Sequence, residues 1–384
     1  MSNQHISVAE EAIALHAKRR GKIEVTSTTE VKDGKDLSLV YTPGVGAVSS
    51  AIAEDPSRAD ELTWIRNTVA IVSDGSAVLG LGNIGPRAAL PVMEGKSVIF
   101  KEFTNINAIP IVLDTQDTEE IIAVTKAIAP TFGAIQLEDI SAPRCFEIEE
   151  RLSKELDMPV FHDDQHGTAV VAMAGLLNAV KIVGKDLKTC RIVLSGAGAA
   201  GIAIAKLLHA YGVEELILVD SQGAIWNGRP GLNPFKQELS AYTNPKKLQG
   251  ELKDVIEGAD IFIGISKPGI VTKAMILSMI QDPIIFALSN PVPEIMPEEA
   301  KEAGVRVIAT GRSDFPNQVN NALCYPGLFR GMLDSGVKQV DDAIKLRAAT
   351  AIASFVDMPT PERFIPTLFD EGLHEAVARS VVSK

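Results

Sequence analysis

Two pairs of adjacent acidic residues carry the clearest chemical signal in the sequence. Glu138-Asp139 follows the apolar run 133–137, and Asp163-Asp164 follows the apolar run 159–161. If these runs are neighbouring parallel strands, both pairs emerge at the edge of the sheet where α/β proteins bind ligands. Converging carboxylates repel one another, and a divalent cation relieves the repulsion. All-oxygen ligands favour Mg²⁺ or Mn²⁺ over zinc. The alternative for either pair alone is helix capping.

A glycine-rich stretch at residues 195–201 has the form of a phosphate-binding turn. It reads Ser-Gly-Ala-Gly-Ala-Ala-Gly and lies between the apolar run 191–194 and a helical segment. Gly196 permits a sharp turn, Gly198 leaves the backbone open to a pyrophosphate, and Gly201 lets the helix pack close to the strand. The helix N-terminus offers N–H groups to phosphate. The cofactor contacts are therefore expected at Gly196, Gly198, Ala199, Ala200 and Gly201.

An acidic residue ends the next apolar run and bears on the choice of nucleotide. Asp220 follows residues 216–219, where an acid accepts hydrogen bonds from the ribose of an adenosine. Its charge would repel a 2′-phosphate, and the neighbouring Ser221 and Gln222 bring no positive charge. The sequence therefore predicts NAD, with NADP left possible. A glycine turn without any ligand is the alternative.

A second G-x-G-x-x-G motif, at residues 80–85, lacks this context. Pro86 interrupts the helix that would follow it, and no strand with a terminal acid comes next. We interpret it as a tight turn that lines a pocket. Just before it, the apolar runs 69–72 and 77–79 flank a Ser-Asp-Gly-Ser turn and predict a β-hairpin.

Several other polar residues have a structural interpretation that competes with a chemical one. Lys96 comes at the end of a short helix, where spacing alone favours a solvated surface lysine. Tyr41 precedes a Pro-Gly loop and by itself is best explained as a packed aromatic with a wet hydroxyl. His162 and His166 flank the second acidic pair, but lone histidines are more often structural than ligating.

The elements that must position these residues alternate between strand and helix. This alternation predicts a parallel sheet in each half of the chain, with a Rossmann-type doubly wound sheet in the second half. Helices are expected over 8–20, 117–129, 143–156, 202–209, from about 167 to 183, and in the C-terminal segment 338–384. Strands are expected over 109–113, 133–137, 159–161, 191–194, 216–219, 260–264, 284–288 and 305–309.

Length and composition set limits on the class of protein. The 384 residues suffice for about two domains, and 46% hydrophobic with 22% charged residues is typical of a globular chain. The net charge of −12 argues against a nucleic-acid or anionic membrane partner. The three cysteines have no metal-binding spacing and fit a reducing compartment. No signal peptide core or membrane-spanning apolar run is recognised, so a cytoplasmic protein is expected.

Taken together, seven stretches resemble the malic enzyme family in its short bacterial form. Their order and spacing are far more specific than any one of them, and they cover most of the chain. They are residues 41–46, 79–85, 138–139, 161–168, 196–201, 288–291 and 320–327. The resemblance implies a smaller N-terminal α/β malic-enzyme domain, residues 1–160, and an NAD-binding Rossmann domain with C-terminal helices, residues 161–384.

The resemblance also assigns roles to residues. It implies that Tyr41 and Lys96 are the acid–base pair and that Asp163 positions the lysine. The family's metal ligands correspond to Glu138, Asp139 and Asp164. Its substrate contacts correspond to Asn290 and Asn321, with Asn320 beside them. Asn290 is also expected to reach the cofactor. Longer relatives carry an arginine before the Leu-Gly-Leu-Gly motif that grips a substrate carboxylate. Val78 stands there in this chain, so another cation or the metal must replace it.

The activity implied is metal-dependent oxidative decarboxylation of (S)-malate to pyruvate and CO₂, with hydride transfer to NAD(P). The family further implies a homodimer. A malolactic enzyme, which retains NADH and releases lactate, shares these motifs and remains an alternative. A non-catalytic NAD-binding sensor is a third possibility, but it would have no need of Lys96 or the carboxylate cluster.

Overall fold

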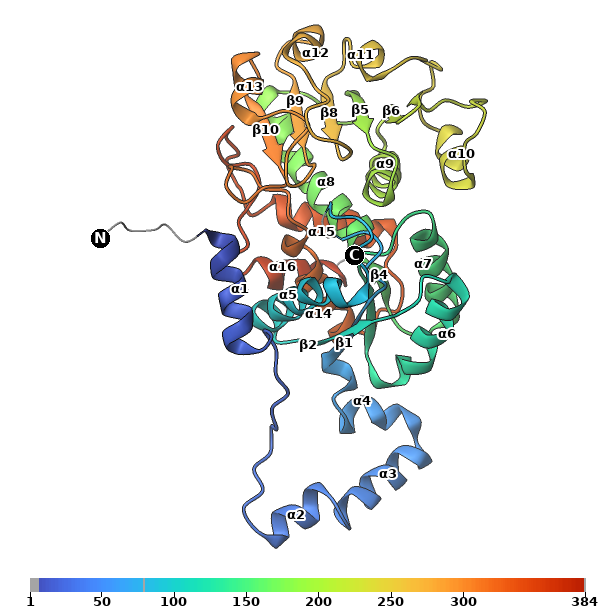
Figure 1. Ribbon diagram of the computed structural model, residues 1–384, viewed down its shortest axis with the longest axis vertical. Helices are drawn as coiled ribbons and strands as arrows, with labels where there is room; N and C mark the ends of the chain where they lie inside the picture. Colours follow the sequence, from blue (N-terminus) through green and yellow to red (C-terminus); the bar gives the residue numbers. More distant parts are fainter. Residues whose placement is uncertain (1–6, 79, 383–384) are drawn as a thin grey trace, which may run out of the picture.

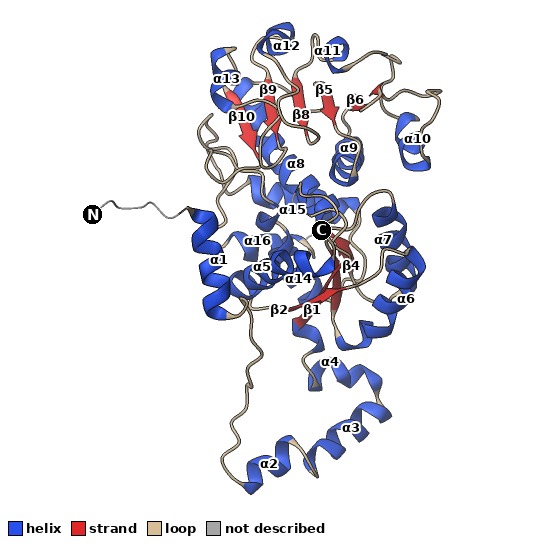
Figure 2. Cartoon of the chain, in the orientation of Figure 1, coloured by secondary structure: helices blue, strands red, loops and turns tan. Residues whose placement is uncertain are grey.

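Two separate sheets form the framework of the chain, one in each half (Figures 1 and 2). The computed structural model describes residues 7–78 and 80–382. Leu79, which belongs to an expected strand and to one of the motifs, lies outside them. The strands are β1 (Thr68–Ser73), β2 (Asn107–Val112), β3 (Ala134–Leu137), β4 (Val160–His162), β5 (Arg191–Ser195), β6 (Glu215–Asp220), β7 (Gly223–Ala224), β8 (Ile261–Gly264), β9 (Ile284–Ala287) and β10 (Val307–Thr310).

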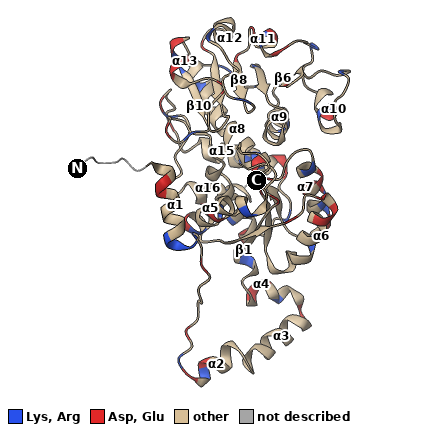
Figure 3. Ribbon diagram, viewed as in Figure 1, with Lys and Arg blue, Asp and Glu red and all other residues tan. Residues whose placement is uncertain are grey.

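Helices surround both sheets. They are α1 (Val8–Arg19), α2 (Gly34–Val40), α3 (Gly44–Glu54), α4 (Ala59–Leu62), α5 (Pro86–Thr104), α6 (Thr118–Ile128), α7 (Arg144–Glu155), α8 (Asp163–Val183), α9 (Ala199–Tyr211), α10 (Pro234–Ser240), α11 (Leu252–Val255), α12 (Lys273–Ser278), α13 (Pro297–Glu302), α14 (Tyr325–Ser335), α15 (Asp342–Ala353) and α16 (Leu373–Ser380). Acidic and basic residues lie close together on α6 and α7, where Arg151 pairs with Glu119 (Figure 3).

The first sheet has the strand order β2-β1-β3-β4, and all its pairings are parallel. The hairpin expected after β1 is wrong. Both edges of β1 are already filled, by β2 and β3, so no edge remains for an antiparallel partner. The chain instead turns through Asp74, whose side chain accepts hydrogen bonds from Ser76, and forms only an isolated bridge between Val78 and Gly82.

The second sheet is the doubly wound one. Its order is β10-β9-β8-β5-β6-β7, with every pairing parallel except β6 with β7. The order reverses between β5 and β8, which is where a sheet of this kind binds its nucleotide. The α/β fold class expected from the sequence is therefore confirmed.

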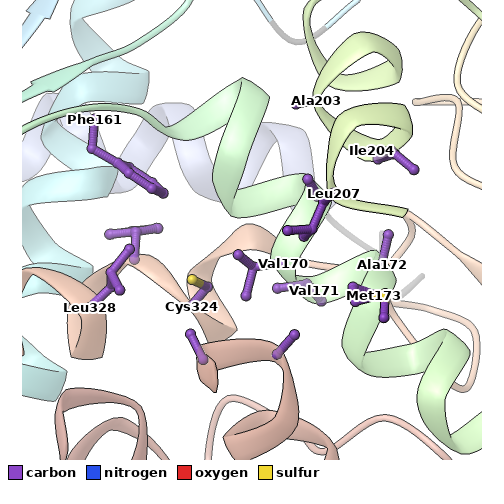
Figure 4. Packing of buried hydrophobic residues seen from close by; sticks show 14 of the residues in the cluster. Phe161, Val170, Val171, Ala172, Met173, Ala203, Ile204, Leu207, Cys324 and Leu328 are labelled. Carbon is purple, nitrogen blue, oxygen red and sulfur yellow. The ribbon is translucent and has the colours of Figure 1, made fainter. Parts of the chain in front are cut away.

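The long helix α8 links the two halves. It has 21 residues, most of them buried, and packs against α9, α15 and residues of α14 (Figure 4). Contrary to the expectation from the sequence, α8 is long and apolar enough to cross a membrane by length and composition, but 67% of its apolar window is buried inside the protein. The core helix of a soluble protein has the same properties.

The halves are interleaved rather than sequential. β4 pairs with β3, so the boundary expected at residue 160 falls inside a strand of the first sheet. Near the C-terminus, α14 returns to the first half, where Phe329 packs on Phe100 of α5 at 5.3 Å between ring centroids. Arg330 also donates from Nη1 to Oδ1 of Asn67 at 2.7 Å.

An arm extends from the first sheet between α1 and β1. It comprises an extended segment followed by α2, α3 and α4, and Figure 1 shows α2 and α3 standing well away from the two sheets. No residue of α2 or α3 is buried. Apolar side chains on these two helices are exposed, among them Leu37 at 51% and Leu39 at 64%. These side chains are therefore not covered by the rest of the chain.

Candidate active site

Lys96 is buried among carboxylates, not solvated at the end of a short helix. It lies in the middle of the 19-residue helix α5, which continues through Pro91. Its Nζ is 2.5 Å from Oδ2 of Asp163 and 3.0 Å from Oε1 of Glu138, and its side chain is 11% exposed. Spacing failed to predict this position because the partners come from elements distant in the sequence.

The carboxylates converge because β3 and β4 are parallel neighbours. Glu138-Asp139 follows β3, and Asp163-Asp164 forms the first turn of α8. This helix begins at Asp163 rather than after Gly167 as expected, and acids in a first turn are favoured by the helix dipole. Gly167 is required there, because a Cβ at this position would lie 1.9 Å from Oδ1 of Asp163.

Three of these acids form a site suited to a divalent cation. One carboxylate oxygen from each of Glu138, Asp139 and Asp164 lies within 4.8 Å of the others. The N–H of Asp139 donates to Oδ2 of Asp164 at 2.8 Å, and Gln136 donates to Oε2 of Glu138 at 2.7 Å, which fixes the orientation of both carboxylates. An all-oxygen, anionic donor set fits Mg²⁺ or Mn²⁺.

Burial and neighbouring charges both shift the pKa values of the ionisable groups in this cluster. Burial, reinforced by the carboxylate of Asp164, raises the pKa of Glu138 well above its usual range. Burial alone would lower the pKa of Lys96, but the carboxylates of Asp163 and Glu138 outweigh it and hold that pKa well above the usual range. Without a cation, the cluster therefore keeps Lys96 protonated.

Tyr325 is a further neighbour that the sequence did not single out. The Nζ of Lys96 lies 4.6 Å from the centroid of its ring, a cation–π distance. Phe100 packs edge-on against the ring of Tyr325, with 4.9 Å between ring centroids. Among the described residues, the buried Tyr325 hydroxyl has no hydrogen-bond partner. Its place in the 320–327 motif was the only signal available.

The loops of the two sheets meet at Asn290, which follows β9. A Cβ at Gly80 would lie 2.6 Å from the carbonyl oxygen of Asn290, and a Cβ at Gly311 would lie 2.6 Å from its Nδ2. The 80–85 turn therefore contacts the second half of the chain. Val78, which stands in the place of the family's arginine, is buried and 1% exposed.

The other two asparagines lie near the start of α8. The Cβ of Asn321 is 3.1 Å from the position a Cβ would take on Gly167, so this residue adjoins the turn that carries Asp163. The side chain of Asn320 accepts from the N–H of Ala322 at 3.0 Å and caps the 3-10 helix η4 (Asn321–Leu323). Substrate contact by Asn290, Asn320 or Asn321 stays a prediction.

The glycine turn has the geometry that a dinucleotide requires. Gly196 has a φ of +119°, and α9 begins at Ala199 with Gly198 as its N-cap. A Cβ at Gly201 would lie 1.9 Å from the carbonyl oxygen of Gly196, so only glycine allows this approach of helix and turn. The N–H groups of the first turn of α9 are therefore available to phosphate.

Asp220 ends β6 as expected, but its surroundings differ from those inferred from the sequence. Arg229 donates to it through both terminal nitrogens, and Lys236 donates to Oδ2 at 2.7 Å. Ser221 and Gln222 bring no positive charge, as the sequence shows, but Arg229 and Lys236 do. The two cations come 9 and 16 residues after it, from the loop and helix that follow β7.

Tyr41 is not brought to Lys96 within one chain. It is the C-cap of α2 on the arm and is 66% exposed, whereas α5 lies in the body of the first half (Figure 1).

His166 pairs with Glu149 at 2.9 Å, away from the acid cluster. A cavity of about 430 Å³ lies beside this pair, between α7, α8, α9 and α15, and the described residues that line it include none of the expected site residues.

Comparisons with known proteins identify the family of this chain. The N-terminal domain of malic enzyme matches residues 20–153, and the NAD-binding domain of malic enzyme matches residues 165–382. An NAD-dependent malic enzyme of Geobacillus stearothermophilus is 58% identical over 98% of this chain and 79% of its own length. A bifunctional malic/malolactic enzyme of Bacillus subtilis (strain 168) is 54% identical over 98% of this chain and 92% of its own length.

A solved structure gives the same result in three dimensions. The crystal structure of the NAD-dependent malic enzyme from Thermotoga maritima matches with a TM-score of 0.94 at 47% identity, over 98% of this chain and 99% of that one. The two domain matches together span most of the sequence; Glu138 and Asp139 lie in the first of them and the glycine turn lies in the second. This chain belongs to the malic enzyme family.

Proposed function

We propose that this chain catalyses the metal-dependent oxidative decarboxylation of (S)-malate to pyruvate and CO₂, with a nicotinamide dinucleotide as the hydride acceptor. The observation that carries the proposal is the buried Lys96, held between Asp163 and Glu138 at the edge of a three-carboxylate cluster. A buried, charge-paired lysine in such a place is typical of catalysis. A nucleotide sensor would have no use for it.

Glu138, Asp139 and Asp164 would hold Mg²⁺ or Mn²⁺. When bound, such an ion supplies Lewis-acid polarisation of the substrate's oxygen atoms. The turn at 196–201 would bind the dinucleotide, whose nicotinamide supplies the redox step. Asn290 lies where the loops of the two sheets meet and would contact the substrate from the nucleotide side.

Lys96 would accept the proton of the malate hydroxyl at Nζ. For this role it must be neutral, whereas Asp163 and Glu138 keep it protonated in the free chain. If Glu138 held a cation, one of the two negative charges that stabilise the ammonium would be neutralised, which would favour the neutral form of Lys96. Asp163 remains as the partner that orients the amine and takes part in relaying its proton.

Tyr41 would protonate C3 of the enolate that remains after CO₂ leaves. Because Tyr41 is exposed on the arm and distant from Lys96 of its own chain, this role requires a second copy. We therefore propose a homodimer in which the arm of one copy completes the site of the other. The exposed apolar side chains of α2 and α3 supply the surface that such an exchange would bury.

Malolactic turnover is the second candidate. The relative from Bacillus subtilis is named a bifunctional malic/malolactic enzyme, and its identity of 54% extends over 98% of this chain. In that reaction NADH stays bound and reduces the product to lactate. The same lysine and the same carboxylates would serve both outcomes.

One assay separates these functions. Purified protein is incubated with malate, Mn²⁺ and NAD or NADP, with and without EDTA, while absorbance at 340 nm and the acids formed are followed. Growth of absorbance with pyruvate, abolished by EDTA, supports the malic reaction. Lactate without net NADH indicates malolactic turnover. Unchanged malate under all conditions would reject both.

A further inference from the structure

Glu294 is a fully buried acid that ties together the loops after β8 and β9. Its Oε1 accepts from the N–H of Ser266 at 2.8 Å, and its Oε2 accepts from the N–H of Ser289 at 3.0 Å. Ser266 follows β8 and Ser289 follows β9, and these strands are parallel neighbours. Each oxygen of the carboxylate therefore holds the backbone of a different loop.

The contact extends from Ser266 to the glycine turn. The hydroxyl of Ser266 lies 3.1 Å from the hydroxyl of Ser195, the last residue of β5. A Cβ at Gly196 would lie 2.6 Å from the carbonyl oxygen of Ile265, so the turn and the loop after β8 touch directly. The strand order reverses between β5 and β8, which is where the nucleotide is expected. Glu294 thus fixes the loops that border this point.

The loop after β9 carries Asn290 directly after Ser289. Close approaches to Gly80 and Gly311 hold the carbonyl oxygen and the Nδ2 of Asn290. A shift of Ser289 would therefore move Asn290 relative to both halves of the chain. The position of this expected ligand contact depends on the hydrogen bond from Ser289 to Glu294.

The charge of Glu294 has no cation to balance it. Among the described residues it forms no ion pair, and its hydrogen-bond partners are backbone N–H groups. Burial raises the pKa of Glu294, and the hydrogen bonds from Ser266 and Ser289 oppose that shift. A buried acid without a cation reduces stability, and groups of this kind concentrate at functional sites. The arrangement therefore favours a role beyond holding the fold.

We propose that Glu294 is a positioning residue for hydride transfer. By holding Ser266 and Ser289 at a fixed spacing, it sets where the nicotinamide lies against Asn290 and the substrate. It acts through the backbone of the two loops, not by contact with the reacting atoms. This inference rests on the proposed function, but it concerns only the nicotinamide half of the nucleotide.

Glu294→Gln tests this role, because the amide keeps the size of the side chain but leaves one N–H without an acceptor. The hydride step is followed by stopped-flow absorbance at 340 nm with malate, Mn²⁺ and NAD. It should slow by about 10 to 100-fold, as small displacements of reacting groups do. ADP-ribose lacks the nicotinamide, and its binding, measured by calorimetry, should be unchanged. Glu298→Gln is the matched control, since it makes the same change at an exposed position in the first turn of α13.

Gly264→Ala disturbs the same contact from the other side. A Cβ at Gly264 would lie 2.6 Å from Cγ and 2.8 Å from Oε1 of Glu294, and the φ of Gly264 is not positive, so the backbone accepts alanine. This variant should also slow the hydride step. The double variant should be no slower than the slower single variant, because both substitutions act through one contact.

The outcomes separate this role from a purely structural one. An unchanged hydride step in Glu294→Gln, or a loss of ADP-ribose binding as large as the loss of rate, would overturn the positioning role alone. Multiplying effects in the double variant would also overturn it. Wild-type protein that binds ADP-ribose but reduces no NAD would overturn the proposed reaction, and this role with it.

Discussion

Lys96 and Asp163 form a buried ion pair between two helices, with 2.5 Å between Nζ and Oδ2. Lys96 comes from α5, which covers the first sheet, and Asp163 opens α8, which runs into the second half of the chain. The side chain of Asp163 is fully buried, so the pair is shielded from solvent. Taking either charge away leaves the other without compensation in the interior.

Lys96→Ala should strongly reduce malate turnover, and nucleotide binding by the variant is measured alongside to show that it has folded. Loss of a general base lowers kcat by about 10² to 10⁴-fold. Lys101→Ala is the control, since Lys101 lies on the same helix but hydrogen-bonds to Asn105 and Asn107 at the surface. The kcat of both variants is measured by steady-state assay. A wild-type kcat in Lys96→Ala would show that Lys96 is not the general base.

Asp163→Asn tests whether this carboxylate positions the lysine. The amide keeps the shape but loses the charge, so Lys96 is held less firmly and kcat should fall by about 10 to 100-fold, the usual effect of removing such a supporting partner. KM for malate should change little, because Asp163 does not contact the substrate. A variant in which only KM rises would place Asp163 among the substrate-binding residues instead.

Asp164→Asn should weaken metal binding without any need for turnover to reveal it. A cation that binds only the folded protein stabilises it by about 2.7 kcal/mol at a concentration 100 times its Kd. Thermal unfolding of the wild type should therefore shift upward with Mn²⁺, and the shift should be lost in Asp164→Asn. Asp157→Asn, at an exposed position outside the cluster, should keep it. An equal Mn²⁺ shift in wild type and Asp164→Asn would contradict the assignment.

Tyr41→Phe and Lys96→Ala should complement each other when their subunits are exchanged. If Tyr41 acts in the partner's site, a mixed dimer has one intact site and one that lacks both residues. Random exchange between the two inactive variants should then restore about one quarter of wild-type activity, given a two-fold symmetric dimer. Absence of recovery, with mixed dimers present by native mass spectrometry, would mean that Tyr41 does not act across the interface.

The cysteine thiols should be inert in the folded enzyme. Cys145, Cys190 and Cys324 are all buried, and burial raises the pKa of Cys190 to about 11. The thiolate is the reactive form, so only about one Cys190 in a thousand would be ionised at pH 8. Reaction with a disulfide reagent at pH 8 should be slow in the native protein and rapid once urea unfolds it. Fast labelling of native protein would show that the core opens readily.

The sequence predicted those parts of the site that depend on neighbouring residues. The strand, the glycine turn and Asp220 follow one another directly, and each acidic pair follows its own strand, so local pattern was enough to find them. The parallel pairing of β3 with β4 then made the convergence of the acids predictable.

What the sequence did not predict depends on distant partners. The environment of Lys96 requires Glu138 and Asp163, and the contact with Asp163 spans 67 positions. The cations at Asp220 come from a loop whose path no periodicity specifies. The exposed position of Tyr41 follows from the path of the arm, in which no residue of α2 or α3 is buried.

The helix α8 has a mechanical consequence for the two sites. Its first turn carries Asp163 and Asp164, and its body packs against α9, whose first turn follows the glycine turn. Both helices are buried in one close-packed core, which has little slack to absorb a shift. A displacement of α9 would therefore press on α8 and, through it, on the carboxylates of Asp163 and Asp164.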